Sequence, residues 1–263
     1  MCCIFGIGLL KDHKIENKDS LIGMVSTLAR EAQSGGRAAS GVSIMREKTA
    51  RVFKRPISSS ELVLSDDFQN FMDEQIVLDH PENKTLSIIG HTRLPTKGTT
   101  ANNNNNHPII INHIIGVHNG IISNDDMLFT RFKDDFDRVA QVDTEIIFQL
   151  LAHFSKERED NTIDAIEKVS SYLSGGYACA AQNANHPYNL YLFRSSNPIR
   201  AIMVKSLGIV MFATRLHFMV KALQVLDHEP DMEELEIVNE AGMVFNLNNR
   251  TYSKFMFPRS KNA

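Results

Sequence analysis

The sequence predicts an α+β fold, and two features of its pattern carry that prediction. Short apolar runs typical of strands gather near both ends and the centre of the 263 residues, with helical runs between them. A chain of the α/β type would instead alternate one strand with one helix. Hydrophobic residues make up 43% of the chain, which is enough to build a large core.

The first half of the chain is predicted to hold strands around one long helix. Residues 2–10 form a short apolar run punctuated by Gly6 and Gly8, which favours a core strand. From 20 to 33, apolar residues recur at three-and-four spacing, and Ser34-Gly35-Gly36 ends this helix. The remaining strands are predicted at 41–45, at 51–54, at 86–90, and once or twice within 109–117.

The second half is predicted to begin with two helices and to end in strands. Helical spacing covers 142–154 and 162–173. The later elements are strands at 177–181, 190–193 and 209–213, a helix near 216–226, and strands separated by turns within 235–257.

One domain, residues 1–263, accounts for the whole chain. The sequence has no internal repeat and no linker rich in Gly, Ser or Pro. The charged, less periodic residues 58–84 are interpreted as an insertion.

Composition excludes several classes of function. With 28 Lys and Arg against 31 Asp and Glu, the chain lacks a strong positive field for nucleic acid. Its mean hydropathy of −0.20 argues against a membrane protein. Cys2, Cys3 and Cys179 are too few for a disulfide framework, and the first residues lack the basic region and cleavage site of a signal peptide. These features predict a cytoplasmic protein.

Cys2 is a candidate nucleophile because of its position. Removal of Met1 would leave a thiol and a free α-amine on one residue. An α-amine has a pKa of about 8, so it can accept the proton of the thiol near neutral pH. On position alone, the alternative is that Cys2 and Cys3 are small buried residues of a first strand.

Other motifs supply groups that could bind and polarise a substrate. Arg93, in a loop after a predicted strand, can pair with a carboxylate through two N–H groups. Asn119 and Gly120 offer a side-chain amide and an open backbone N–H, which together suit an oxyanion hole. Asp143 places a carboxylate at the start of a predicted helix.

Each of these residues also has a purely structural interpretation. Arg93 could be a surface or ion-paired arginine, and Thr96 a hydroxyl at a strand end. Asn119-Gly120 is typical of a hairpin turn, and Asp143 of a helix N-cap.

Taken together and in this order, the motifs resemble the class II glutamine amidotransferases, which are N-terminal-nucleophile hydrolases. The matching segments are Cys2-Cys3-Ile4-Phe5-Gly6, Gly36 with Ala39-Ser40-Gly41, Gly90-His91-Thr92-Arg93, Asn106-His107-Pro108, Val117-His118-Asn119-Gly120 and Asp143-Thr144-Glu145. Weaker similarity extends to the final strands. The resemblance implies a four-layer αββα sandwich and hydrolysis of the side-chain amide of glutamine through a cysteinyl thioester.

The resemblance also implies a role for each catalytic residue. Cys2 would attack the amide, with its own α-amine as base and then acid. Asn119 and Gly120 would stabilise the oxyanion. The family needs no metal and no cofactor for this reaction.

For substrate binding, the resemblance implies four further residues. Arg93 would bind the α-carboxylate of the substrate and Asp143 its α-ammonium group. Thr96 and the backbone near Gly98 would line the pocket.

Three single positions and one pair of residues depart from the family pattern. Cys3 stands where glycine is usual, Ala38 where aspartate is common, and Lys97 where several members have histidine or a small residue. The Leu94-Pro95 pair replaces an aromatic-small pair. These departures leave the rate and the substrate preference open.

The predicted substrate is glutamine or another γ-glutamyl amide. A synthase domain has no counterpart in this sequence, so the ammonia would reach a separate synthase subunit or be released. The alternatives are a γ-glutamyl peptide hydrolase of the same fold and an inactive interaction module. A metal-binding module is a further alternative, whose ligands would be Cys2, Cys3, His91, His107, His113 and His118, although their spacing matches no standard zinc pattern.

Overall fold

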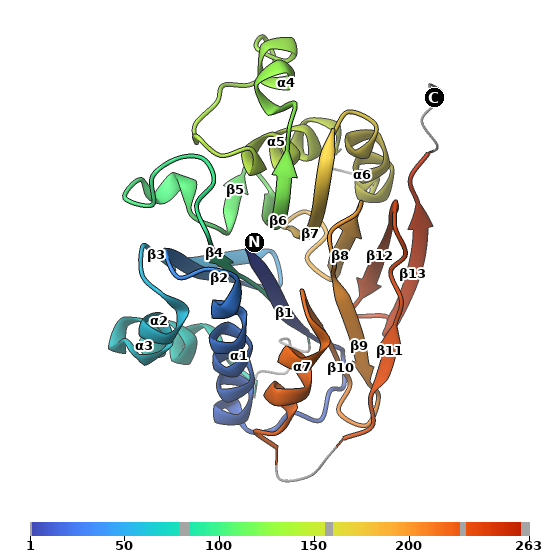
Figure 1. Cartoon of the computed structure of the whole chain (residues 1–263). Coiled ribbons are helices and arrows are strands. Elements are labelled where there is room, and N and C mark those ends of the chain that lie inside the picture. The colour runs from blue at the N-terminus through green and yellow to red at the C-terminus, as the bar shows by residue number, and fades with distance from the viewer. Residues whose placement is uncertain (1, 79–84, 156–159, 227–229, 259–263) are drawn as a thin grey trace.

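The computed structural model describes residues 2–78, 85–155, 160–226 and 230–258. These residues form two antiparallel sheets packed face to face, with helices on both outer faces (Figure 1). The first sheet has the order β11 (Glu233–Leu235), β9 (Arg200–Val204), β10 (Ile209–Ala213), β1 (Cys3–Leu9), β4 (Leu86–Arg93), β2 (Ala39–Arg46) and β3 (Thr49–Arg55). The second has the order β13 (Thr251–Met256), β12 (Ala241–Asn246), β8 (Asn189–Arg194), β7 (Gly175–Asn183), β6 (Ile114–Ile122) and β5 (Ile109–Ile111).

The helices form the two outer layers of the sandwich. The first sheet is covered by α1 (Lys18–Ala32), α2 (Ser59–Leu64), α3 (Asp66–Gln75) and α7 (Leu216–Leu223). The second sheet is covered by α5 (Thr144–Phe154) and α6 (Thr162–Ser170), and α4 (Asp125–Arg131) follows β6 (Figure 1). This arrangement confirms the αββα sandwich that the resemblance implied.

Three apolar clusters hold these layers together. One lies between the first sheet and its helices, a second between the second sheet and α5 and α6, and a third between the two sheets. Every residue of β1 is buried, because the strand runs through the middle of its sheet with a helix layer on one side and the second sheet on the other. This explains why its sequence is an unbroken apolar run rather than an alternation.

The long periodic elements agree with the sequence prediction. The structure adds strand β9 and helices α2, α3 and α4, for which the sequence had predicted no element. Within the predicted insertion 58–84, α2 and α3 bury Leu62, Val63, Phe68 and Met72, whereas residues 79–84 lie outside the described part of the chain. None of the described helices is long and apolar enough to cross a membrane.

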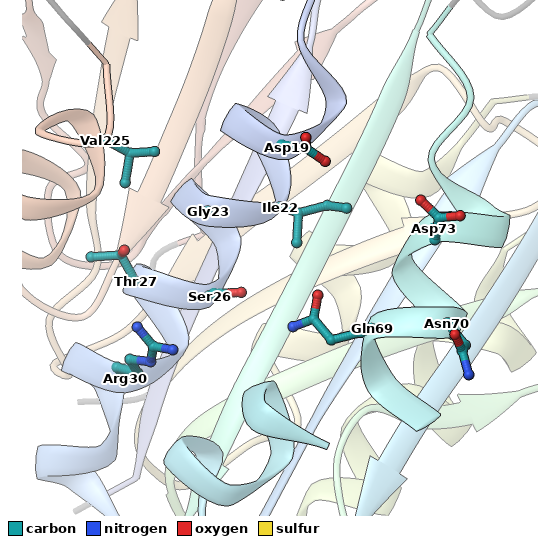
Figure 2. Close-up of a pocket in the computed structure, with 10 residues that line it drawn as sticks. All are labelled: Asp19, Ile22, Gly23, Ser26, Thr27, Arg30, Gln69, Asn70, Asp73 and Val225. Atoms are coloured by element: carbon teal, nitrogen blue, oxygen red, sulfur yellow. The ribbon is translucent and has the colours of Figure 1, made fainter. Parts of the chain in front are cut away.

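A polar groove of about 560 Å³ lies on the outer helix layer, between α1 and α3 (Figure 2). Asp19, Ser26 and Arg30 line it from α1, and Gln69, Asn70 and Asp73 from α3. None of its lining residues belongs to the motifs singled out above. The motif residues come together elsewhere, next to the first residues of β1.

Candidate active site

The motif residues come from both sheets and from one helix of the sandwich. Cys2 directly precedes β1, and Arg93 is the last residue of the neighbouring strand β4. Asn119 and Gly120 lie in β6 of the second sheet, which packs against β1 and β4. Asp143 directly precedes α5. Electrostatic interactions join Cys2 to both Arg93 and Asp143.

The Cys2 thiol is partly buried and is held by the backbone that follows β4. Its Sγ accepts a hydrogen bond from the Leu94 N–H at 3.3 Å and lies 3.4 Å from the Leu94 carbonyl oxygen. Burial raises the pKa of the Cys2 thiol, which the Leu94 hydrogen bond and the charge of Arg93 partly oppose. A thiol with a raised pKa is a poor nucleophile unless a base takes its proton.

Cys3 does not crowd this site. Adjacent residues of a strand point to opposite faces, and Cys3 is buried in the cluster between the first sheet and its helices. Burial also raises the pKa of the Cys3 thiol. The departure from glycine is therefore accommodated in the core.

Arg93 is a buried cation that forms no ion pair within the described part of the chain. Its side chain donates to Asn106 Oδ1 at 2.8 Å and to the carbonyl oxygens of Lys97 and Gly98 at 2.6 and 2.9 Å. Among the described residues, no carboxylate lies within ion-pair distance of Arg93, which is 3% exposed. Its structural interpretation as a surface or ion-paired arginine is thus wrong. A buried guanidinium held only by neutral groups suits the binding of an anion.

The backbone of Arg93 requires a glycine on a neighbouring segment. A Cβ on Gly36, just after α1, would lie 2.2 Å from the carbonyl carbon of Arg93. The Arg93 carbonyl also accepts a hydrogen bond from the Ala38 N–H at 3.1 Å. Gly36 therefore lets the end of α1 pack directly against the residue that carries the guanidinium.

Asn119 and Gly120 lie within a strand, not in a turn. They pair with Ala178 and Tyr177 of β7, so the hairpin interpretation is wrong. The Asn119 side chain is fully buried, and neither its Oδ1 nor its Nδ2 has a hydrogen-bond partner among the described residues. A buried amide without partners is costly, which is typical of a group that serves a ligand.

Glycine is the only residue type that fits at position 120 of β6. Its φ is +154°, and a Cβ there would lie 2.1 Å from the Gly176 carbonyl oxygen of β7. The close pairing of the two strands thus leaves no room for a side chain at this position.

Asp143 precedes α5 but does not cap it. Its side chain makes no capping hydrogen bond with the described backbone of that helix. Oδ2 instead accepts from the Ile122 N–H of β6 at 2.7 Å, and the residue is 8% exposed. The N-cap interpretation is therefore wrong. No basic side chain of the described residues lies within ion-pair distance of Asp143, so the site holds a buried anion beside its buried cation.

The loop after β4 carries the two pocket-lining residues that the resemblance implied. Thr96 is exposed, whereas Gly98 is half-buried and its carbonyl accepts from Arg93. Between them, Lys97 turns toward α4 and pairs with Asp125 at 2.7 Å and with Asp126 at 3.1 Å. A cavity of about 520 Å³ beside this loop is lined by Lys97, Gly98, Arg138, Val139, Ala140 and Gln141.

Asn106 and a buried histidine cluster are functional candidates that the sequence did not reveal as such. The motifs predicted no role for Asn106, and for His91, His107 and His118 only the alternative role of metal ligands. Asn106 orients the Arg93 guanidinium. The rings of His91 and His107 pack against each other with centroids 4.0 Å apart and planes tilted by 34°. Burial lowers the pKa of His91 to about 3 and that of His118 to about 4, and it also lowers the pKa of His107. No group of three or more His, Cys, Asp or Glu suited to a metal ion occurs within the described residues.

The buried histidines predict a loss of stability in mild acid. In the unfolded chain, histidine binds a proton below a pH of about 6.5, whereas the folded protein keeps these three neutral. Unfolding therefore takes up protons as the pH falls below 6.5. Each histidine should lower the free energy of unfolding by about 1.4 kcal/mol per pH unit until its folded-state pKa is reached. Urea denaturation at pH values from 7.5 to about 5 measures this slope.

The exposed His217 provides the control for this experiment. The variant His217→Gln should keep the same slope between about pH 6.5 and 5, a range above the usual pKa of carboxyl groups. A free energy of unfolding that stays constant over this range would contradict the prediction.

The fold and the site together define a class of protein. A cysteine at the start of the central strand of an αββα sandwich interacts electrostatically with a buried cation and a buried anion. The facing sheet carries a buried amide that has no hydrogen-bond partner among the described residues. This is the arrangement of an N-terminal-nucleophile amidohydrolase.

Comparison with known proteins identifies the family. Residues 91–221 match the family described as a glutamine amidotransferase domain. Glutamine–fructose-6-phosphate aminotransferase (isomerizing) of Staphylococcus epidermidis is 29% identical over 166 residues, which are 62% of this chain and 25% of that protein. The enzyme of the same name from Staphylococcus aureus strain Mu50 is 30% identical over the same shares of both chains. The chain spans about a quarter of the length of these relatives.

The solved structures agree with this family in their fold. Glutamine phosphoribosylpyrophosphate amidotransferase from B. subtilis, complexed with ADP and GMP, superposes with a TM-score of 0.68 and 18% identity. The match covers 98% of this chain and 50% of that one. The protein is a glutamine amidotransferase domain of class II, with the N-terminal-nucleophile fold. The resemblance drawn from the motifs is confirmed.

Proposed function

We propose that this domain hydrolyses the side-chain amide of glutamine to glutamate and ammonia, with Cys2 as the nucleophile. The observation that carries the proposal is that Arg93 and Asp143 are buried charges with no ion pair in residues 2–78, 85–155, 160–226 and 230–258. A free amino acid has one carboxylate and one ammonium group on the same carbon, and this pair matches both. Binding such a zwitterion would neutralise two charges whose burial is otherwise costly.

Substrate binding follows from how the two charges are held. Asn106 and the carbonyls of Lys97 and Gly98 fix the Arg93 guanidinium, which would receive the α-carboxylate. The Ile122 N–H fixes one oxygen of Asp143, which would receive the α-ammonium group. Thr96 and the backbone of Gly98 would line the pocket between them and the amide.

The chemistry begins at the thiol. After removal of Met1, the α-amine of Cys2 would take the proton of its own thiol, which the raised pKa of that thiol makes necessary. The sulfur would attack the amide carbon, while Asn119 Nδ2 and the Gly120 N–H stabilise the oxyanion. The protonated amine would then pass a proton to the departing ammonia, and water would cleave the γ-glutamyl thioester.

The fate of the ammonia is a second part of the proposal. Relatives that carry this domain are named glutamine-dependent aminotransferases, and three quarters of their length lies outside the match. We infer that the ammonia passes to a synthase partner. Residues 1–263 would act as one glutaminase domain, because β1 pairs with both β4 and the late strand β10. The three free cysteines suit the reducing cytoplasm.

The test is an assay of glutamate and ammonia release by the purified protein, combined with its intact mass. We expect a mass that lacks Met1 and equal amounts of the two products from glutamine. A γ-glutamyl peptide assayed in parallel distinguishes a peptidase-like relative. Retention of Met1 in an active protein, or no turnover of either substrate by the processed protein, would overturn the proposal.

A further inference from the structure

We propose that the hydroxyl of Thr144 links the side chains of His107 and His118. These three residues, here called the relay, hold the oxyanion donor Asn119 and the ammonium-binding Asp143 in position. The inference rests on the proposed function and adds three positioning residues behind the site.

The relay is defined by a single oxygen atom. Thr144 Oγ1 lies 2.9 Å from His107 Nε2 and 2.9 Å from His118 Nδ1. His118 directly precedes Asn119 in β6, and Thr144 directly follows Asp143 at the start of α5. One hydroxyl thus joins the residue before the oxyanion donor to the residue after the ammonium-binding carboxylate.

Packing extends the relay to the rest of the site. A Cβ on Gly120 would lie 2.8 Å from His118 Nε2, so the imidazole lies close against the backbone of the second oxyanion donor. His107 follows Asn106, which binds Arg93 at 2.8 Å. The His107 ring also packs against the ring of His91, at a tilt of 34°. Small movements of this cluster would therefore displace groups that bind three parts of the substrate.

The hydroxyl also couples the choice of ring nitrogen that carries the proton in the two neutral imidazoles. Thr144 has one proton, which it can donate to one imidazole nitrogen while it accepts an N–H from the other. If it donates to His118 Nδ1, both rings carry their proton on Nε2. If it donates to His107 Nε2, both rings carry it on Nδ1. Both histidines are neutral in this arrangement, which agrees with their burial at 2% and 5% exposure.

The decisive variants are Thr144→Val and Thr144→Ser, assayed for glutamine hydrolysis. Valine preserves the shape of the side chain and removes the hydroxyl, so kcat should fall about tenfold or more, since misplaced catalytic groups are costly. Serine restores the hydroxyl and should return kcat to within about threefold of wild type. Melting temperatures above the assay temperature establish that the variants are folded.

A double variant shows whether the relay acts through the oxyanion donor. In an Asn119→Ala background, Thr144→Val should lower kcat by less than about threefold, because the oxyanion donor through which the relay acts on kcat is already absent. Its effect through the substrate-binding Asp143 would remain in KM. If Thr144→Val lowers kcat by the same factor with and without Asn119→Ala, the relay is overturned. A Thr144→Val variant that melts earlier but keeps kcat within twofold overturns it as well, because the hydroxyl would then be only structural.

Histidine ¹⁵N NMR provides a readout that does not depend on turnover. Signals are assigned with His107→Gln and His118→Asn. Between pH 6 and 8, we expect His107 and His118 to stay neutral and to carry their protons both on Nδ1 or both on Nε2. In the Thr144→Val variant, the position of the proton on one ring should no longer depend on the other ring. Protons on differently named nitrogens overturn the relay. A wild-type protein that releases no glutamate overturns the proposed function, and the spectra still decide the relay.

Discussion

Replacement of Cys2 by alanine is expected to lower the rate of glutamate release at least about a thousandfold. Alanine is small enough to permit the removal of Met1, so the variant keeps a free α-amine and loses only the sulfur. In the proposed mechanism, no thioester can form without the thiol, and Asn119 and Gly120 would have no covalent tetrahedral intermediate to stabilise. The measurement is the initial rate of glutamate formation at saturating glutamine.

Cys3 supplies the matched control for this experiment. It is the same residue type one position later, but its side chain is buried in the core beneath the helices. Cys3→Ala should therefore keep the rate within a few-fold while lowering stability by the loss of a buried group. The assignment of the nucleophile is wrong if Cys2→Ala turns over glutamine at a rate comparable to that of the parent.

Asn119→Ala is expected to lower kcat by about a hundredfold to a thousandfold, with little change in KM. The oxyanion exists only after the thiol has attacked, so its donor stabilises the transition state more than the bound substrate. The amide has no hydrogen-bond partner among the described residues, so its loss breaks no described interaction of the resting protein. Stability should therefore change little or increase.

The control for this variant is another fully buried asparagine. Asn183 in β7 donates to Thr162 Oγ1 at 3.0 Å, far along its strand from the residues paired with Asn119 and Gly120. Asn183→Ala should lower the melting temperature and leave kcat within about twofold. If Asn119→Ala loses stability but keeps kcat, Asn119 is a structural residue and the oxyanion hole lies elsewhere.

Most of the fold could be predicted from sequence because its larger elements are locally periodic. The α1 helix and the β1 strand were found from their spacing and composition alone. Helix α2 was missed although Ser58 and Glu61 form a capping box, a signal that marks the start of a helix. Strand β9 and helix α4 have five and seven residues, which is too short for a clear period.

The turn interpretation of Asn119-Gly120 failed for a different reason. This dipeptide favours a turn locally, but pairing with Ala178 and Tyr177 extends β6 through it. The partner strand β7 lies about sixty residues later in the chain. No local pattern could reveal that pairing.

By itself, the sequence determined the chemistry that is available: a cysteine that can become terminal, a guanidinium, a carboxylate and an amide, in an order that resembles one family. Only the tertiary structure decided that Arg93 and Asp143 are buried with no ion-pair partner among the residues that the structure describes, and that Asp143 binds the Ile122 N–H instead of capping α5. The histidine relay likewise depends on contacts between residues 26 and 37 positions apart. The physical reason is that periodicity reports only which face of an element is buried, whereas the partner of a buried polar group is set by which segments the packed sheets bring together.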